Sequence, residues 1–417
     1  MKPLSPIAFL REHAVLAVSA VAAVASMVAV PPDSAYWGYF DWKTLGCLFC
    51  VLAVASALRL MGAFDRAART VIARFGSPRS LALALVLTTA ALSCVATNDM
   101  ALIMMLPLSA ATLVGAGRAR LIPAVFVLQS LAANLCGMIV PFGNPQNLYL
   151  YSYYGLHLGD FLRTMALPFT VSVVGVVAAT WWLAGRPGRK KASAEATRGI
   201  TTAKAPASST PAARAAIGAA AEPATAPVPR RPMPLSRRRL GAYGVLLALT
   251  LLAVFRVLPI AVAVAAVAAT LAALDRRALA AVDWSLLATF ACFFVFAGNL
   301  ARIPELAAWL GPLMDDHGLV ISAGASQVIS NVPAAVLLSH FTDAWQPLLV
   351  GVNIGGAGTL VGSLASLITL QHFTSVRKVF PQTRDVPELS TGRFLGLFTL
   401  LNVAFLVILL VVCGLCG

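Results

Sequence analysis

Long apolar runs dominate the chain and alternate with short polar or charged loops. Stretches such as Val245 to Val254 and Phe394 to Val412 are apolar on nearly every helical face. A transmembrane strand would instead alternate apolar and polar residues over about ten positions. Runs that approach or exceed the roughly 20 residues needed to cross a hydrocarbon core recur in both halves of the sequence. The pattern therefore predicts an all-α polytopic membrane protein.

Composition favours the same class of protein. Of the 417 residues, 59% are hydrophobic and only 11% are charged, which gives more apolar surface than a soluble core of this length needs. The first apolar run, about residues 15–30, is interpreted as a retained helix, because further runs follow it and no convincing cleavage site precedes Pro31. The seven cysteines lie mostly inside apolar runs without further metal ligands nearby. We expect no cofactor and no metal centre, apart from sodium as a coupling ion.

A basic segment of low hydrophobicity divides the chain. Residues 186–239 are rich in Ala, Pro, Ser and Thr, and they contain 12 Lys or Arg against Glu195 and Glu222. Such a composition is typical of a disordered linker, which we favour over an arm that binds nucleic acid. The predicted organisation is a first membrane repeat at 1–185, a cytoplasmic linker at 186–239 and a second membrane repeat at 240–417.

The remaining basic residues predict the orientation in the cell (inner) membrane, since short cytoplasmic loops are enriched in Lys and Arg. Four basic clusters alternate with loops that are acidic or poor in charge; the clusters lie at 66–79, 118–120, 276–277 and 377–384. Only one topology places all four clusters, the N-terminus and the linker in the cytoplasm. It requires residues 81–116 and 319–340 to leave and return on the same side, so we predict that both are re-entrant hairpins.

The two membrane segments resemble each other in sequence. Polar residues of the first recur in the second in the same order: Asp41 with Asp283, Asn98 with Asn331, Asn134 with Asn353, and Gly143 with Gly362. The last two pairs share a separation of 219 residues. We interpret this as an internal duplication. Because an odd number of predicted crossings separates the copies, we expect two inverted repeats, each with a re-entrant hairpin and a broken helix.

Four polar interruptions fall at membrane depth, namely the two hairpin tips and the two Gly-rich helix breaks. Helices that begin there present free N–H groups and a positive dipole end to an anion. Carbonyls and Asn, Ser or Thr side chains offer oxygen ligands to sodium. The predicted substrate-binding residues are Asn98, Asp99, Asn144, Asn147, Asn331, Thr359 and Ser363. The predicted cation-binding residues are Thr97, Asn98, Asp99, Gly143, Ser330, Asn331 and Gly362.

Asp99 is the acidic residue that lies deepest within an apolar segment, where a charge is costly. Two interpretations are open. Asp99 binds the coupling cation or exchanges a proton, or else it caps the second helix of its hairpin through backbone N–H groups.

The motifs at 97–103, 143–148, 330–333 and 351–363 resemble those of the citrate-transporter-like permeases of the ion transporter superfamily. This group is related to divalent-anion sodium symporters and arsenite permeases. In the symporters a Ser-Asn-Thr triplet at each tip binds sodium and substrate carboxylate. The resemblance gives that role to residues 97–99 and 330–332, although Asp99 and Val332 depart from the triplet. It also implies a homodimer and elevator-like movement.

These features predict a secondary active transporter of a small anion, either a carboxylate or an inorganic oxyanion, coupled to a sodium or proton gradient. The alternatives are a cation/proton antiporter that uses Asp99 and an arsenite-type efflux permease. An enzyme is not expected, because the spans contain no nucleophile with a base and no second carboxylate. The expected partners are the anion, sodium or a proton, and the lipid bilayer, with no nucleic acid.

Overall fold

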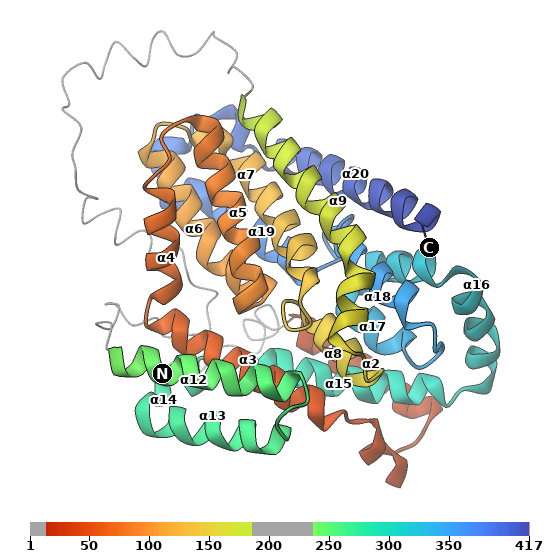
Figure 1. The fold of residues 1–417 in the computed structure, drawn as a ribbon. Helices are drawn as coiled ribbons and strands as arrows, with labels where there is room; N and C mark the ends of the chain where they lie inside the picture. The colour runs from red at the N-terminus through yellow and green to blue at the C-terminus, as the bar shows by residue number, and fades with distance from the viewer. Residues whose placement is uncertain (1–13, 186–236, 417) are drawn as a thin grey trace, which may run out of the picture.

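The computed structural model describes residues 14–185 and 237–416, and every regular element in those ranges is helical. The predictions for the N-terminus and for most of the linker fall outside these residues. Figure 1 shows the helices as one assembly, with α9 and α20 side by side on one face. The α12 helix begins at Arg237, inside the segment assigned to the linker.

The first half contains α2 (Ala14–Ala29), η1 (Ser34–Tyr39), α3 (Trp42–Leu60), α4 (Ala63–Ile72), α5 (Pro78–Ala96), α6 (Asn98–Gly115), η2 (Ala119–Leu121), α7 (Ile122–Leu131), the π-helical turn η3 (Ala132–Cys136), η4 (Gly137–Ile139), α8 (Pro145–Tyr153) and α9 (Leu158–Gly185). The second half contains α12 (Arg237–Val254), α13 (Ile260–Leu274), α14 (Arg276–Ala280), α15 (Trp284–Ala301), α16 (Pro304–Ile329), α17 (Asn331–Leu338), α18 (Trp345–Ile354), α19 (Leu364–Val379), η6 (Pro381–Thr383), η7 (Pro387–Leu389) and α20 (Thr391–Cys416).

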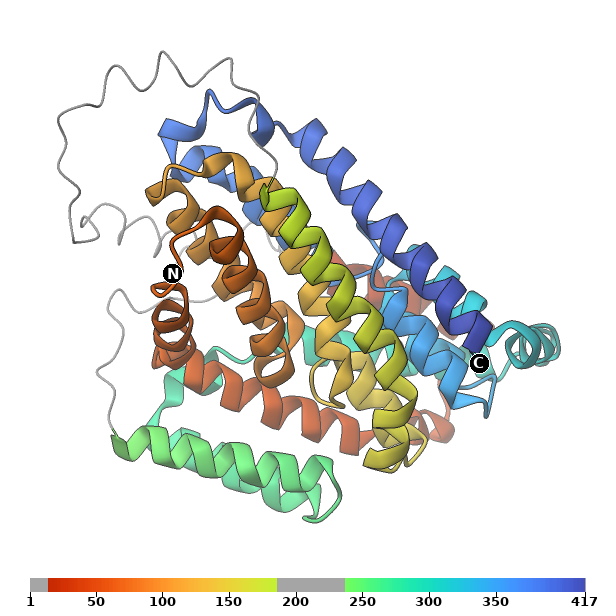
Figure 2. The same cartoon turned by 45° about the horizontal axis from the view of Figure 1, so that its top comes forward.

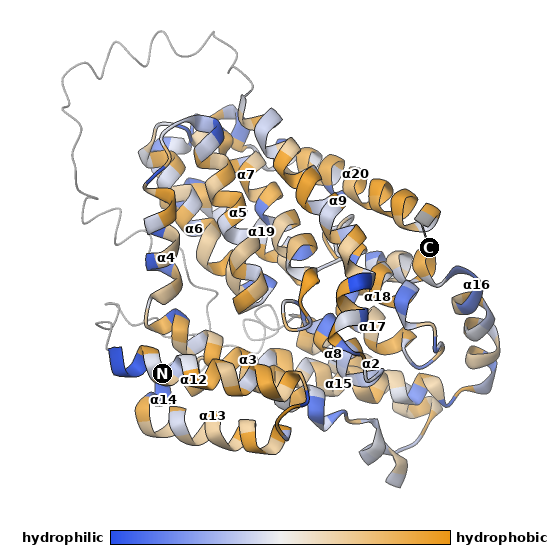
Figure 3. Cartoon of the chain, in the orientation of Figure 1, coloured by the Kyte–Doolittle hydropathy of each residue, from blue (hydrophilic) through white to orange (hydrophobic). Residues whose placement is uncertain are grey.

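The prediction of an all-α polytopic membrane protein is confirmed. Among the described residues, seven helical segments are long and apolar enough to cross a bilayer; they include α3, α9, α15 and α20. Large apolar side chains such as Val174, Leu400 and Val407 are exposed, and Figure 3 shows α20, which carries the last two, largely in the colour of hydrophobic residues. Exposure of such side chains along whole helices is what a lipid-facing surface requires.

The two hairpins differ in the length of their arms. The arms of the first, α5 and α6, have 19 and 18 residues, and both are among the helices long enough to cross a bilayer. In the second, α16 is kinked at His317 and α17 has only 8 residues. At 1.5 Å per residue α17 spans about 12 Å, well short of a hydrocarbon core. This length supports the re-entrant prediction for the second hairpin, while that for the first stays a prediction.

The helices α3 and α15 begin in the same way. Asp41 and Asp283 occupy the N-cap positions, and each side chain accepts a hydrogen bond from the backbone N–H three residues later, at 3.0 Å and 2.9 Å. Such a bond satisfies one of the unpaired donors at a helix start. The same local device therefore begins the corresponding helix in both halves.

Helices of each half pack against the other half. The α2 helix of the first half packs on α15 of the second, while α12 and α13 of the second half pack on α3 of the first. Figure 2 shows α3 lying against the green α12 and α13 pair. Asn299 of α15 donates to Ser26 of α2 at 2.9 Å. At Gly46 an added Cβ would lie 2.8 Å from Ile260, so glycine permits the close approach of α3 to α13.

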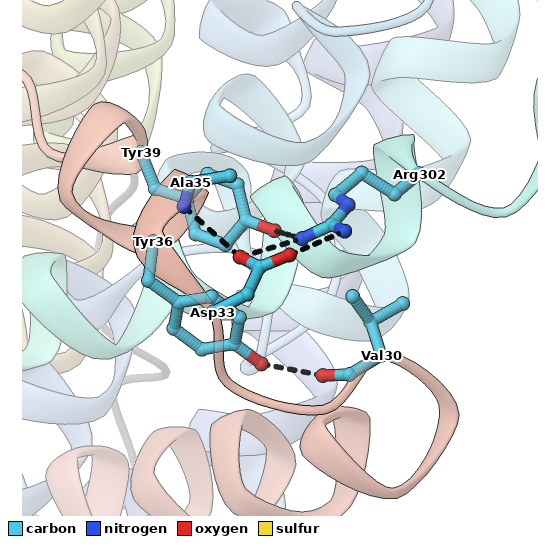
Figure 4. A network of polar contacts seen from close by, with 6 residues as sticks. All are labelled: Val30, Asp33, Ala35, Tyr36, Tyr39 and Arg302. Atoms are coloured by element: carbon cyan, nitrogen blue, oxygen red, sulfur yellow. Dashed lines mark hydrogen bonds and ion pairs between the residues drawn. The ribbon is translucent and has the colours of Figure 1, made fainter.

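An ion pair joins the halves near η1. The Asp33 carboxylate accepts from the Arg302 guanidinium at 2.7 Å and 3.0 Å, and Arg302 also donates to the Tyr39 hydroxyl at 3.0 Å (Figure 4). The hydrogen bonds from Arg302 hold the pKa of Asp33 below its usual value. Asp33 and Arg302 come from two different loops that the charge pattern predicts to be external, and the structure brings these loops together.

Candidate functional site

The two hairpin tips have the same backbone conformation. Thr97 has φ 67° and ψ 153°, and Ser330 has φ 73° and ψ 155°. A residue with a Cβ is rarely found there, and such a conformation costs about 1–3 kcal/mol unless its surroundings fix it. Each of these residues separates two helices whose chain direction reverses around it. The recurrence of one strained turn at both predicted tips marks them as a matched pair.

Each tip is fastened to one of the helix breaks. The N–H of Asn98 donates to the Gly143 carbonyl at 3.1 Å, and the N–H of Asn331 donates to the Gly362 carbonyl at 3.1 Å. A Cβ on Gly143 would lie 2.1 Å from the Gly137 carbonyl oxygen, so this position excludes any side chain. Both breaks lie where the sequence predicts them. The α8 helix begins just after Gly143, and α19 begins just after Gly362.

These contacts bring four helix starts together. The helices α6 and α17 begin at the tips, and α8 and α19 begin two residues after the glycines to which the tips bind. Backbone N–H groups in a first helical turn are not used within the helix. Here the N–H groups of Asn98 and Asn331 already donate to the glycine carbonyls, and that of Asp99 donates to the Asn98 side chain. The positive dipole ends of the four helices still make the centre favourable for an anion without a basic side chain.

Asparagine side chains connect the centre across the two halves. Asn98 donates to Asn134 at 3.0 Å, and Asn134 donates to Ser363 at 2.8 Å. All three residues are buried. The first tip, the π-helical turn of the first half and the second break are therefore joined in a single chain of hydrogen bonds.

Asn353 connects a second group of buried side-chain amides across the two halves. Its amide nitrogen donates to Asn147 at 2.5 Å, and its oxygen accepts from Gln146 at 3.2 Å and from Asn144 at 3.4 Å. These residues are at most 1% exposed. Buried amides in such a network hold a unique arrangement only when their partners are present. Asn134 and Asn353 were noted as repeat-related residues but were not among the predicted binding residues, yet they link both halves.

Asp99 lies in the first turn of α6 and is partly buried. Its Oδ1 is inaccessible to solvent and has no hydrogen-bond partner among the described residues. The N–H of Asp99 itself donates to the Asn98 side chain at 2.9 Å. The capping interpretation requires backbone N–H groups of α6 to donate to the carboxylate, and no such bond is present in the described part of the chain. The structure therefore gives no support to the capping interpretation, and the binding role of Asp99 stays a prediction.

The predicted polar residues of the second break and the second tip point in different directions. Ser363 is buried and caps α19 by accepting from the N–H of Ser366 at 3.3 Å. Thr359 is exposed and donates to the backbone carbonyl of Gln327 at 2.9 Å. Ser330 lies 3.5 Å from both the Gly362 carbonyl and the Asn331 side chain. Ser363 and Ser330 thus belong to the centre, while Thr359 faces α16.

Gln327 was not predicted as a site residue. It lies on α16, three residues before the tip residue Ser330, and its carboxamide is enclosed by the second break. The residue three positions before Thr97 in the first hairpin is Cys94. A polar residue one helical turn before a tip is the signal that would have found Gln327.

A buried polar centre, formed where two hairpin tips meet two interrupted helices inside a multi-span protein, is the architecture of a membrane transporter. The chain belongs to the CitMHS family of citrate transporters, whose sequence pattern matches residues 7–351.

Several relatives are similar over most of their length. The inner membrane protein YbiR of Escherichia coli is 32% identical over 336 residues, which is 79% of this chain and 80% of the relative. A protein of Methanocaldococcus jannaschii, described as an uncharacterized transporter, is 27% identical over 79% of this chain and 81% of its own length. An uncharacterized transporter of Mycobacterium tuberculosis is 25% identical over 79% and 78%.

Proposed function

We propose that this protein is a secondary active transporter that carries a small anion, a carboxylate or an inorganic oxyanion, coupled to a sodium or proton gradient. The observation that carries the proposal is the convergence of four helix starts on one buried centre. Helix starts and neutral amides recognise an anion by hydrogen bonds and dipoles, which leaves it free to dissociate on the other side.

Oxygen atoms at the same centre support coupling to a cation. Asp99 Oδ1 and Asn144 Oδ1 are buried and accept no hydrogen bond from the described residues. Leaving such acceptors unsatisfied costs about 1–3 kcal/mol each, a cost that a bound cation removes. A negative substrate and a positive ion would also offset each other's charge within the membrane.

Asp99 also supports a second candidate function, exchange of a cation for a proton. A partly buried carboxylate is an exchange site if its proton and the cation compete for the same oxygens. In that case the anion would not be carried, and the ion flux would persist without it. The arsenite-type efflux permease is the remaining alternative and differs from the first proposal in substrate and direction.

Transport by the purified full-length protein in proteoliposomes tests these functions. We expect uptake of one anion from a panel of carboxylates and oxyanions, arsenite included, to rise when a sodium or proton gradient is imposed. A matched preparation without protein is the control. Cation and proton exchange without any anion flux would overturn the first proposal in favour of the antiporter.

We further propose that the halves are inverted repeats in an inner membrane, with the N-terminus and linker cytoplasmic. The contacts join loops predicted to lie on the same side: the Arg79 guanidinium lies 5.0 Å from the Trp181 ring, close to the start of the linker, and Tyr154 donates to the Thr342 carbonyl at 2.7 Å on the opposite side. The relative in Escherichia coli is named an inner membrane protein. Labelling of single cysteines at positions 315 and 205 from the same side of the membrane would refute this topology. The dimer stays a prediction.

A further inference from the structure

We propose that α4 binds the phosphate headgroups of anionic lipids with its outer face and so lies in the interface between membrane and water. The inference concerns one surface helix, away from the buried polar centre, and does not depend on what the protein transports. It rests on the position of α4, on the side chains of its two faces and on a comparison with the helix that precedes the second hairpin tip.

The α4 helix is too short to be a membrane span. At 1.5 Å per residue its 10 residues cover about 15 Å, half the thickness of a hydrocarbon core. Gly62, with φ 70°, turns the chain at its start, and Figure 1 shows α4 running across the end of α3. Phe64, Ala68 and Ile72 recur every fourth residue and are buried, and α4 packs against α3 and α5. One face of α4 is thus used by the protein, and the opposite face is left on the surface.

Three arginines lie on the outer side of α4 and of the turn that follows it. Arg66, Arg69 and Arg74 are exposed, and none of them forms an ion pair in the described part of the chain. Asp65 is the single acidic residue between positions 62 and 77, so the segment keeps a net positive charge. A guanidinium binds phosphate through two parallel hydrogen bonds and stays charged at physiological pH. This face therefore complements the phosphate of an anionic lipid.

Apolar side chains lie in the same segment as these arginines. Val71 and Phe75 are 43% and 42% exposed, and acyl chains just beneath the headgroups would cover them. A few residues later, the Arg79 guanidinium lies 5.0 Å from the ring of Trp181, and both residues are exposed. Tryptophan is enriched where the membrane meets water. The combination favours a lipid over a soluble anion such as free phosphate.

The second half shows that a helix in this position needs no basic residues. The first part of α16, from Pro304 to the kink at His317, precedes the second hairpin tip as α4 precedes the first. It contains Glu305, Asp315 and Asp316, and no Lys or Arg. The fold itself therefore does not require the arginines of α4. The linker is disfavoured as the occupant of this face because its own charge is strongly positive.

Native mass spectrometry of the purified full-length protein tests the proposal, with phosphatidylglycerol as the probe and phosphatidylcholine as the comparison without net charge. We expect phosphatidylglycerol to bind about tenfold more tightly or better. Arg66→Gln combined with Arg69→Gln should weaken its binding about 25-fold, at about fivefold for each arginine. Arg276→Gln combined with Arg277→Gln removes the same charge from α14, another short exposed helix, and should leave the binding unchanged.

Equal binding of the two lipids by the wild type would overturn the proposal. The same loss in the α14 variant would also overturn it, because the effect would then be one of net charge alone. Arg66→Lys combined with Arg69→Lys keeps the charge and should retain most of the affinity, which separates loss of the site from damage to the fold.

Two further results would reassign this face. Displacement of phosphatidylglycerol by an equal concentration of inorganic phosphate would identify a site for a soluble anion. A dimer that disappears in the variant with both Gln substitutions in α4 would identify a second copy of the chain as the occupant. Either result would overturn the assignment to lipid.

Discussion

The two hairpin tips share a backbone but differ in the side chains around it. The turns at Thr97 and Ser330 agree within a few degrees in φ and ψ, and the N–H of the following Asn makes a bond of 3.1 Å to a glycine carbonyl in each. The next position is Asp99 at the first tip and Val332 at the second. A common scaffold can thus keep its geometry while the chemistry of its two copies diverges.

The third helical position after each turn adds to the difference. Met100 in α6 carries a backbone N–H, whereas Pro333 in α17 has none. The second tip therefore has one donor fewer for an anion, and it has no carboxylate. We expect the first tip to respond to ions and the second mainly to position the substrate.

The largest effect is expected from removing the asparagine that both tips retain. Asn98→Ala and Asn331→Ala should each reduce transport to the level of empty proteoliposomes, because each removes a side chain from the start of a converging helix, and Asn98 also loses its bond to Asn134. Initial uptake rates measure the loss. Asn402→Ala is the control, since this buried residue donates within α20 instead. Full activity in both tip variants would refute the site assignment.

Asp99→Asn tests whether the first tip is the one that senses the ion gradient. The variant preserves most of the shape of the side chain but removes its charge. We expect it to fold, to transport slowly and to show the same rate with and without the gradient. Uptake at matched substrate concentration, with the gradient imposed or collapsed, measures this. A wild-type response to the gradient in Asp99→Asn would leave Asp99 without the coupling role.

A glycine near the second tip should give a smaller effect. A Cβ on Gly356 would lie 3.0 Å from the Asn331 amide nitrogen and 3.2 Å from the Asn353 carbonyl. Gly356→Ala should therefore shift the tip slightly and slow transport about tenfold, equivalent to about 1.4 kcal/mol. Gly324→Ala on α16 has nothing within 4 Å of the added methyl and should be neutral. Equal rates in the two variants would contradict the close packing at Gly356.

The smallest effect concerns the Asp33 and Arg302 pair, which lies outside the centre. Because Arg302 lowers the pKa of Asp33 in the folded protein, the pair stabilises the fold above the unfolded pKa of about 4. This contribution is lost as the pH falls through the lower, folded pKa. Melting temperatures of the wild type and Arg302→Gln in detergent should therefore converge at low pH. A difference in melting temperature that stays constant at all pH values would mean that protonation of Asp33 is not coupled to unfolding.

The sequence was sufficient to predict the helical class, the two tips and the two breaks, because polar residues inside apolar runs are costly and therefore conspicuous. The starts of α3 and α15 follow a local signal, an Asp that directly precedes an apolar run. The contacts of Asn134 with Ser363 and of Asn353 with Asn147 could not be predicted, because each joins residues more than 200 positions apart in the sequence. Gln327 was missed because the backbone groups that bind its side chain lie on a loop about 30 residues later in the sequence.

The exchange of α2 and α13 between the halves has a consequence for biogenesis. During synthesis the first half enters the membrane while the partners of α3, namely α12 and α13, are still unmade. Arg256 is also absent at that stage, and its guanidinium later binds the carbonyls of Tyr151 and Gly155 at 2.7 Å and 2.6 Å, at the end of α8. The first half therefore stays incompletely packed until the chain beyond the linker has been synthesised.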